Sequence, residues 1–534
     1  MSNSRSRKRL LSLLIPIICF TMIFSGCSST KVQEENASPP MTSERSESDS
    51  GNMVFKMSLA ESSETNDEYW QPTMNTEEYN HISENPFLSV KANKFSTFAA
   101  DVDTASYANI RRMILAGKEP PADGVRIEEM INYFKYDYPK HEGGQPFSVT
   151  TQLAPCPWND QSQLLMIGLQ GKTIDKSELP ASNLVFLIDV SGSMEEPNKL
   201  PLVKRAFLLL AENISEKDKI SIVTYASDDA VVIDGAGGEQ KTEIMSAIEN
   251  LESGGATHGS KGIETAYELA EKHFIKGGNN RVILATDGDL NVGTTSEGEL
   301  TGLIEEKKKS GVFLSVMGFG DGNIKDNKME ALADHGDGNY SYVDTIDEAR
   351  RVLIEEIGGT LFTIAKDVKL QVEFNPAVLK GYRLIGYENR LMNAEDFSND
   401  KVDGGEIGAG HRVTVLYEIV KNDSEFEIPE VESKYSQEET NNSKDWLTLN
   451  IRYKEPDGTE SKLLSYGVDE SMYRNEMSED MSFAAGVAQA GMILRDSKYK
   501  GNTSIEEVID RLSKLKSTQT DEYKKEFLYL LGKI

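Results

Sequence analysis

The stretch Leu184-Val-Phe-Leu-Ile-Asp-Val-Ser-Gly-Ser193 decides the fold of this chain. Its opening run of apolar residues, rich in β-branched and aromatic types, predicts a strand that is buried on both faces. The strand ends at Asp189, and Ser191 and Ser193 follow at alternate positions of a Gly-containing loop. A carboxylate and two hydroxyls in one loop are oxygen ligands that suit a hard divalent cation. Short Asp, Ser and Gly runs also form turns that cap a helix, so this motif needs support from other segments.

Strand and helix patterns alternate on the C-terminal side of this stretch. Strands are predicted at 219–225, 230–233, 281–286, 312–319 and 340–343, and helices at 200–213, 241–251, 262–274, 299–310, 328–334 and 346–357. Regular alternation of this kind is typical of the α/β fold class. We therefore predict a doubly wound, mostly parallel sheet over residues 182–360.

The support for a metal site comes from two further segments of the predicted sheet. Ligands of such sheets bind at the carboxyl ends of the strands, where the winding reverses. Asp287 follows a second predicted strand, and Thr257 lies in a Gly-rich loop between the two strands. We predict that Asp189, Ser191, Ser193, Thr257 and Asp287 meet at one divalent cation, Mg²⁺ or alternatively Mn²⁺ or Ca²⁺.

Two residues beside the predicted ligands receive other roles. We expect His258 to face solvent, because nitrogen donors suit Zn²⁺ better than Mg²⁺. Asp289 is expected in a loop turn or as a hydrogen-bond partner of a ligand.

Composition excludes some partners. The 534 residues carry a net charge of −30, which argues against nucleic acid because no surplus of Lys and Arg is present to displace phosphate counterions. Of the three cysteines two lie in the first 27 residues, so Cys156 is expected to be a buried, inert thiol.

The N-terminus reads as an export signal. Basic residues precede an apolar run over 10–24, which is shorter than the roughly 18 residues of a spanning helix. Ser25-Gly-Cys27 follows, and here the chain resembles bacterial lipoprotein signals, whose Cys is lipidated and becomes the mature N-terminus. The resemblance implies a signal peptide over 1–26 and lipidation at Cys27, with a plain signal peptide or an uncleaved anchor as alternatives. Residues 27–86 are predicted to be a disordered acidic tether.

Three regions flank the predicted α/β domain. Residues 87–181 are expected to hold helices and strands, 361–478 a β-rich domain, and 479–534 three C-terminal helices. Strand patterns near 147–153 and 164–169 lack local partners, so we predict that they join the β-rich region, with the α/β domain inserted between. Asp101 and Asp103 resemble a metal pair, but we predict that they cap a helix that begins at 103 or 104.

The segment 182–360 resembles the von Willebrand factor A domain. That family carries a metal-ion-dependent adhesion site made of Asp-x-Ser-x-Ser, a Thr in a later loop and an Asp after the fourth strand. The five predicted ligands match those places without substitution. Further motifs are similar to YfbK-type bacterial lipoproteins: Asp101-Val-Asp-Thr-Ala-Ser-Tyr107, Tyr133-Phe-Lys-Tyr-Asp-Tyr-Pro139, Asp287-Gly-Asp-Leu-Asn-Val-Gly293 and Gly386-Tyr-Glu-Asn-Arg390.

These resemblances imply a protein-binding module of the bacterial cell envelope and no enzymatic activity. The module would be anchored to a membrane through lipidated Cys27 and would bind a carboxylate of a partner protein through its cation. One alternative is an envelope scaffold with a structural metal. The other is a Mg²⁺-dependent phosphohydrolase with Asp189 as nucleophile and Asp287 and Asp289 as helpers, but Ser191 cannot protonate a leaving group near neutral pH.

Overall fold

The computed structural model describes residues 75–140, 143–175, 177–256, 259–288, 297–356, 362–429, 443–456 and 458–534. Pro72–Ile534 forms one compact unit. The predicted signal peptide, Cys27 and most of the predicted tether lie outside the described residues. Order begins earlier than the predicted residue 87, because the backbone of Thr76 and Glu78 already pairs with the 322–324 backbone.

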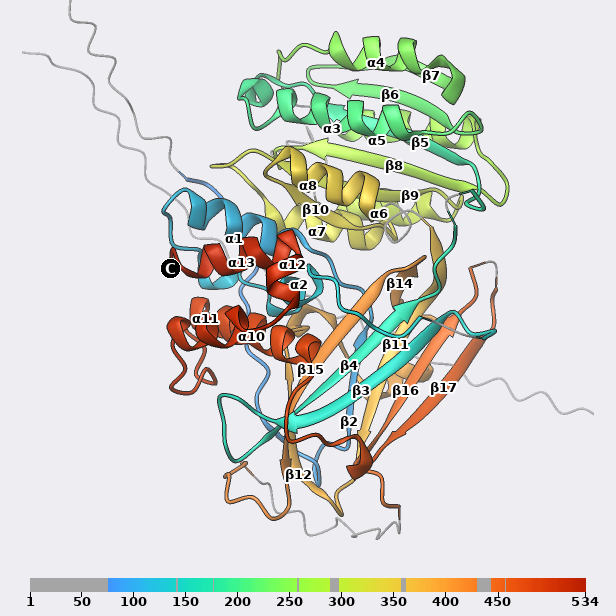
Figure 1. Cartoon of the computed structure of the whole chain (residues 1–534). Coiled ribbons are helices and arrows are strands. Elements are labelled where there is room, and N and C mark those ends of the chain that lie inside the picture. The colour runs from blue at the N-terminus through green and yellow to red at the C-terminus, as the bar shows by residue number, and fades with distance from the viewer. Residues whose placement is uncertain are drawn as a thin grey trace, which may run out of the picture. The chain divides into compact units, whose positions relative to one another are not determined.

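The predicted α/β domain is built on a mixed sheet with the strand order β10-β9-β8-β5-β6-β7 (Figure 1). All of these strands run parallel except β7, which is antiparallel to β6. Their bounds are Ser182–Asp189 for β5, Lys219–Tyr225 for β6, Asp229–Gly237 for β7, Asn279–Thr286 for β8, Phe313–Phe319 for β9 and Tyr340–Val343 for β10. The predicted doubly wound α/β fold is confirmed.

Helices cover both faces of this sheet, because successive side chains of a strand point to opposite faces. Leu184, Phe186 and Ile188 of β5 join a core with helices α3, α4 and α8, while Val185 and Leu187 join a core with α5, α6 and α7. The bounds are Leu200–Asn213 for α3, Lys241–Glu249 for α4, Gly259–Lys272 for α5, Glu297–Lys308 for α6, Asp326–His335 for α7 and Ile346–Arg350 for α8. The helix predicted over 346–357 continues past α8 as a π-helix, Arg351–Glu355.

Two antiparallel sheets pack face to face and share one apolar core, which includes Leu165, Leu370, Val415 and Leu449. One has the order β1-β12-β15-β4-β3 and the other β13-β2-β11-β16-β17, with β14 paired to β11. The bounds are Leu88–Ser89 (β1), Phe95–Ala99 (β2), Phe147–Pro155 (β3), Gln163–Gly171 (β4), Thr363–Phe374 (β11), Leu379–Ile385 (β12), Leu391–Met392 (β13), Gly405–Gly408 (β14), Arg412–Lys421 (β15), Leu447–Lys454 (β16) and Ser461–Val468 (β17).

The pairing of β4 with β15 confirms the predicted insertion. Leu165 of β4 is opposite Tyr417 of β15, and the whole α/β domain lies between these strands in the sequence. β3 pairs with β4 within the chain before the insertion, whereas β1, β2 and β4 find partners in the chain that follows it.

Helices from both ends of the chain pack together in a fourth apolar cluster. Their bounds are Ala105–Leu115 (α1), Ile127–Asn132 (α2), Glu479–Leu494 (α10), Ile505–Ser513 (α11), Ser517–Thr520 (α12) and Glu522–Leu531 (α13). Phe134 lies 4.9 Å from Phe483, measured between ring centroids, and α1 and α2 lie beside the C-terminal helices (Figure 1). The short α12 is an addition to the three helices predicted for the tail. Among the described residues, no helix has the length and apolar character needed to cross a bilayer.

Candidate metal centre

The two predicted carboxylate ligands lie at neighbouring strand ends. Asp189 is the last residue of β5 and Asp287 follows the last residue of β8, and these strands are parallel neighbours in the sheet. Both residues are fully buried. Parallel strands have their carboxyl ends at the same edge of the sheet. Asp189 and Asp287, which are far apart in the sequence, therefore lie at one edge, as predicted.

The loop after β5 brings its two serines together beside Asp189. The backbone N–H of Ser191 donates to Oδ1 of Asp189 over 2.9 Å, and the hydroxyls of Ser191 and Ser193 are 3.0 Å apart. Ser191 is buried and Ser193 is half-buried, at the start of a 3-10 turn. The structure thus groups three of the predicted ligands in one loop.

The loop that carries Thr257 is bonded to this site through its preceding glycines. The N–H of Gly254 donates to the carbonyl of Val190 over 2.7 Å, and that of Gly192 donates to the carbonyl of Gly255 over 3.1 Å. Thr257 itself lies outside the described residues, as do His258 and Asp289. The positions predicted for these three residues stay predictions.

Sequence reasoning missed two residues that hold Asp287. Its Oδ2 accepts a hydrogen bond from Nζ of Lys199 over 3.1 Å and from Nδ2 of Asn323 over 3.0 Å. Asn323 belongs to Gly320-Asp-Gly-Asn323, which follows the carboxyl end of β9. Asn323 could have been predicted by looking for polar residues at the carboxyl end of this third strand, as was done for Asp189 and Asp287.

Thr286 was also missed, because it lies within the predicted strand. Its hydroxyl donates to Oδ2 of Asp189 over 3.4 Å and accepts the N–H of Gly288 over 3.1 Å. A bond from β8 to the carboxylate of β5 ties the two halves of the site together.

The electrostatics favour a cation. The pKa of Asp189 is raised to about 6, chiefly by burial and in smaller part by the nearby Asp287, while hydrogen bonds from Ser191 lower it. Two buried carboxylates face one buried ammonium, that of Lys199, so these three groups carry a net negative charge. Carboxylate and hydroxyl oxygens are hard donors, so the donor set fits Mg²⁺ or Mn²⁺.

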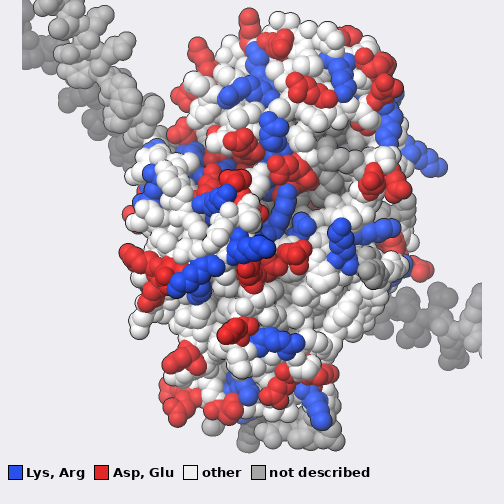
Figure 2. Space-filling view, in the orientation of Figure 1, with Lys and Arg blue, Asp and Glu red and all other residues white. Residues whose placement is uncertain are grey.

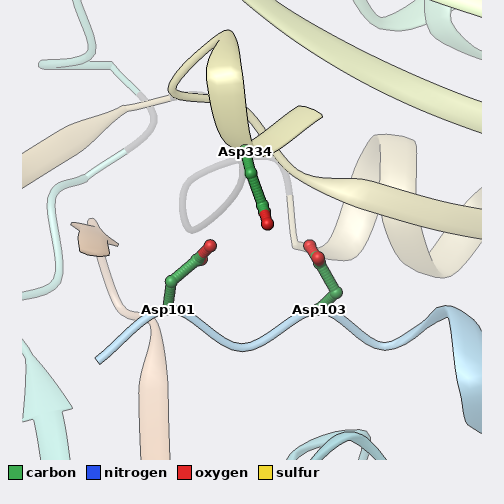
Figure 3. Close-up of side chains that lie close together, drawn as sticks. All are labelled: Asp101, Asp103 and Asp334. Carbon is green, nitrogen blue, oxygen red and sulfur yellow. The ribbon is translucent and has the colours of Figure 1, made fainter. Parts of the chain in front are cut away.

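A second group of carboxylates, Asp101, Asp103 and Asp334, converges on one point (Figure 3). Arg390 lies among them: its guanidinium is 3.1 Å from Asp103 and 3.7 Å from Asp101, and it also pairs with Asp334. An arginine therefore supplies the positive charge here, and the group links the start of α1 to the end of α7.

The predicted helix-capping role of Asp101 and Asp103 is wrong. Helix α1 begins after Thr104 without a side-chain cap, and the N–H of Ser106 instead donates to Glu129 over 2.8 Å. Asp103 accepts the N–H of Tyr340 over 2.8 Å, so its carboxylate serves β10. Glu129 therefore accepts the hydrogen bond at the start of α1, and Asp101 and Asp103 pair with Arg390 instead.

Cys156 is buried, as predicted. It lies in the apolar cluster of the terminal helices, and burial raises the pKa of its thiol well above the usual range. A thiol that resists ionisation is a poor nucleophile.

Family comparisons agree with this architecture. The profile of the von Willebrand factor type A domain matches residues 183–355, and that described as "Uncharacterized protein YfbK, C-terminal" matches residues 359–534. A third profile, described as von Willebrand factor, matches residues 73–166.

Several proteins are similar in sequence. The protein YfbK of Escherichia coli (strain K12) is 42% identical over 467 residues, which cover 85% of this chain and 80% of that protein. The protein sll0103 of Synechocystis is 29% identical over 188 residues, 35% of this chain and 43% of that protein. Human inter-alpha-trypsin inhibitor heavy chain H3 is 29% identical over 192 residues, 34% of this chain and 21% of that protein.

The chain is partly similar to several solved structures. A von Willebrand factor type A protein from Catenulispora acidiphila has a TM-score of 0.39 at 14% identity and covers 72% of this chain and 89% of its own. The ArnB paralog VWA2 from Sulfolobus acidocaldarius has a TM-score of 0.37 at 17% identity, covering 73% and 97%. The 42% identity to YfbK over most of both chains shows that this chain belongs to the YfbK family, and it contains a von Willebrand factor type A domain, a type of domain that is typically a protein-interaction module and commonly holds a divalent metal at a metal-ion-dependent adhesion site.

Proposed function

We propose that the chain binds a carboxylate of a partner protein through a divalent cation held by Asp189, Ser191, Ser193, Thr257 and Asp287. The observation that carries this proposal is the pair of buried carboxylates at the ends of β5 and β8, with the two serine hydroxyls beside the first. Serine and threonine are neutral donors, so only the two aspartates offset the charge of a bound Mg²⁺ or Mn²⁺, and the cation can still accept an anionic ligand. The chain's own residues fix the donor oxygens and exclude bulk water from the two aspartates.

The charge of the surface favours protein over nucleic acid as the partner. Acidic and basic side chains are interspersed on the face shown in Figure 2, and the whole chain carries a net charge of −30. Binding to nucleic acid draws on clustered Lys and Arg.

The test is capture of envelope proteins by the full chain with Mg²⁺ or with EDTA, comparing wild type with Asp189→Ala. We expect a set of proteins that wild type captures only with Mg²⁺ and that Asp189→Ala does not capture. Asp234→Ala is the matched control, because Asp234 is an exposed aspartate of β7 that pairs with Lys272. Capture that is insensitive to EDTA, or retained by Asp189→Ala, contradicts the proposal.

Two other functions give different results in the same samples. A scaffold with a structural metal would show a metal-dependent melting temperature without metal-dependent capture. A phosphohydrolase would turn over p-nitrophenyl phosphate. Ser191 lies where that chemistry wants a second carboxylate, and its hydroxyl is 3.0 Å from that of Ser193.

We also propose that lipidated Cys27 anchors the chain to a membrane of the cell envelope. The test is metabolic labelling with an alkyne fatty acid followed by membrane fractionation. Cys27→Ser should lose the label and leave the membrane fraction. Cys19→Ser, which changes the other leader cysteine, should keep both properties. Label on the Cys27→Ser chain would contradict lipidation at this residue.

A further inference from the structure

We propose that Lys199 weakens cation binding at the metal centre and, in return, strengthens the hold of the bound cation on a carboxylate ligand. The inference rests on the proposed function and adds a positioning residue to it. Lys199 lies at the start of α3, and its Nζ donates to Oδ2 of Asp287 over 3.1 Å and to the carbonyl of Ser193 over 3.0 Å. It thus contacts two of the three segments that supply the proposed ligands.

The surroundings of Lys199 hold its side chain in this place. Only 6% of the side chain is exposed, and its second charged neighbour, Glu196, is 4.0 Å away and mostly exposed. The aliphatic part passes Gly320, where a Cβ atom would lie 2.5 Å from Cε of Lys199. Gly320 has a φ of +79°, a conformation that glycine adopts without strain. Burying an ammonium is costly unless it is paired, so its bond to Asp287 is an essential part of this arrangement.

Asp287 is held through one of its oxygens by two donors. Asn323 donates to the same Oδ2 as Lys199, over 3.0 Å. These bonds orient the carboxylate and place a positive charge within hydrogen-bond distance of a residue that also serves the cation. The carbonyl of Ser193, bonded to the same ammonium, fixes the serine loop relative to Asp287.

The charge balance gives the direction of the effect. Asp189, Asp287 and the Lys199 ammonium together carry one net negative charge, so a divalent cation leaves the centre with one net positive charge. Without the ammonium the same cation would be neutralised by the two aspartates. Like charges a few ångström apart in a buried site repel strongly, so Lys199 disfavours the cation and favours an anionic ligand on it.

The experiment is isothermal titration of the purified full chain with Mn²⁺. Lys199→Met removes the ammonium and keeps the length of the aliphatic part of the side chain, and we expect it to bind Mn²⁺ about tenfold tighter than wild type. Lys199→Arg keeps the charge and should stay close to wild type. Arg205→Met, which also removes one positive charge from the same helix, is the matched control, because Arg205 is exposed.

A second measurement follows the ligand position with acetate as the probe. When acetate replaces a water molecule on bound Mn²⁺, the relaxation enhancement of the water protons falls. Lys199→Met should need several-fold more acetate than wild type for the same decrease. Lys199→Gln, also neutral, replaces Lys199→Met if circular dichroism shows that the latter is not folded.

The outcomes separate this inference from the proposed function. If wild type binds Mn²⁺ and both neutral variants bind it equally or more weakly, the role of Lys199 is overturned. If Lys199→Met shows the same acetate dependence as wild type, the proposed effect of Lys199 on the carboxylate ligand is overturned. If wild type does not bind Mn²⁺ at all, the proposed function fails; tight binding by Lys199→Met in that case would still support the charge argument.

Discussion

Nη2 of Arg390 lies 3.1 Å from Oδ2 of Asp103, a residue 287 positions earlier in the chain. The side chain of Asp103 is fully buried and that of Arg390 is 10% exposed, and the N–H of Tyr340 donates to the other oxygen of Asp103 over 2.8 Å. The pair therefore joins three segments: the start of α1, the edge strand β10 of the α/β sheet, and the turn between β12 and β13. The first two predictions follow from it.

Arg390→Met should lower the free energy of unfolding by about 3–5 kcal/mol at pH 8, because removing one partner of a buried ion pair leaves its carboxylates uncompensated. Urea denaturation followed by circular dichroism measures this. Arg452→Met is the control: its pair with Asp400 is partly exposed, and such pairs contribute about 0–1 kcal/mol. Equal effects of the two substitutions would show that the Asp103 pair is not a structural clamp.

Stability should fall as the pH rises from about 4 to 7. Burial, reinforced by Asp334 and opposed by Arg390, raises the pKa of Asp101 to about 7, and burial raises the pKa of Glu128 and Glu330 to about 7. In this range the folded chain holds protons that the unfolded chain has released, so unfolding becomes easier as the pH rises, by on the order of 1–3 kcal/mol.

The check is the free energy of unfolding measured in EDTA at steps from pH 4.5 to 8. Asp101→Asn should flatten the slope, because the amide does not titrate. Asp160→Asn is the control: because Asp160 is exposed, this substitution should leave the slope unchanged. A stability that increases across this range in wild type would contradict the assignment.

Gly320→Ala should destabilise the chain more than Gly322→Ala. Both glycines have positive φ, +79° and +85°, so both substitutions carry backbone strain. Only at Gly320 would the new Cβ meet a neighbour, the Lys199 side chain, whereas nothing lies within 4 Å at Gly322. The difference between the two, about 1–2 kcal/mol in urea denaturation, isolates the overlap with Lys199. Equal losses would mean that the lysine moves aside at no cost.

Glu77→Ala should loosen the loop that carries Asn323. Glu77 is buried, pairs with Arg112 over 3.0 Å and accepts the N–H of Gly322 over 2.9 Å. Its loss leaves a buried arginine and a loop N–H without this acceptor, at a cost of about 1–3 kcal/mol. Amide hydrogen exchange over residues 320–326 should become faster.

Glu119→Ala is the matched control for this change, since Glu119 is exposed. Unchanged exchange in Glu77→Ala would show that the loop is held without the N-terminal segment.

The sequence by itself determined the elements of the α/β domain and the two acidic strand ends. A continuous apolar run with β-branched residues predicts a buried strand wherever it lies, and the carboxyl-end rule then locates Asp189 and Asp287. The pairing of β4 with β15 was also predicted, but the premise that these strand patterns lack local partners was only partly right, because β4 also pairs with β3. These signals are local periodicities or follow directly from them.

Only the tertiary structure decided which charges meet. Lys199 and Asp287 are 88 positions apart, and Asp103 and Arg390 are 287 apart. Local rules predicted that Asp103 caps its own helix, but Glu129 of α2 bonds the start of α1 and Asp103 pairs with Arg390 instead. A buried charge must be neutralised by whichever opposite charge the packing brings within reach, and that choice leaves no periodic trace in the sequence.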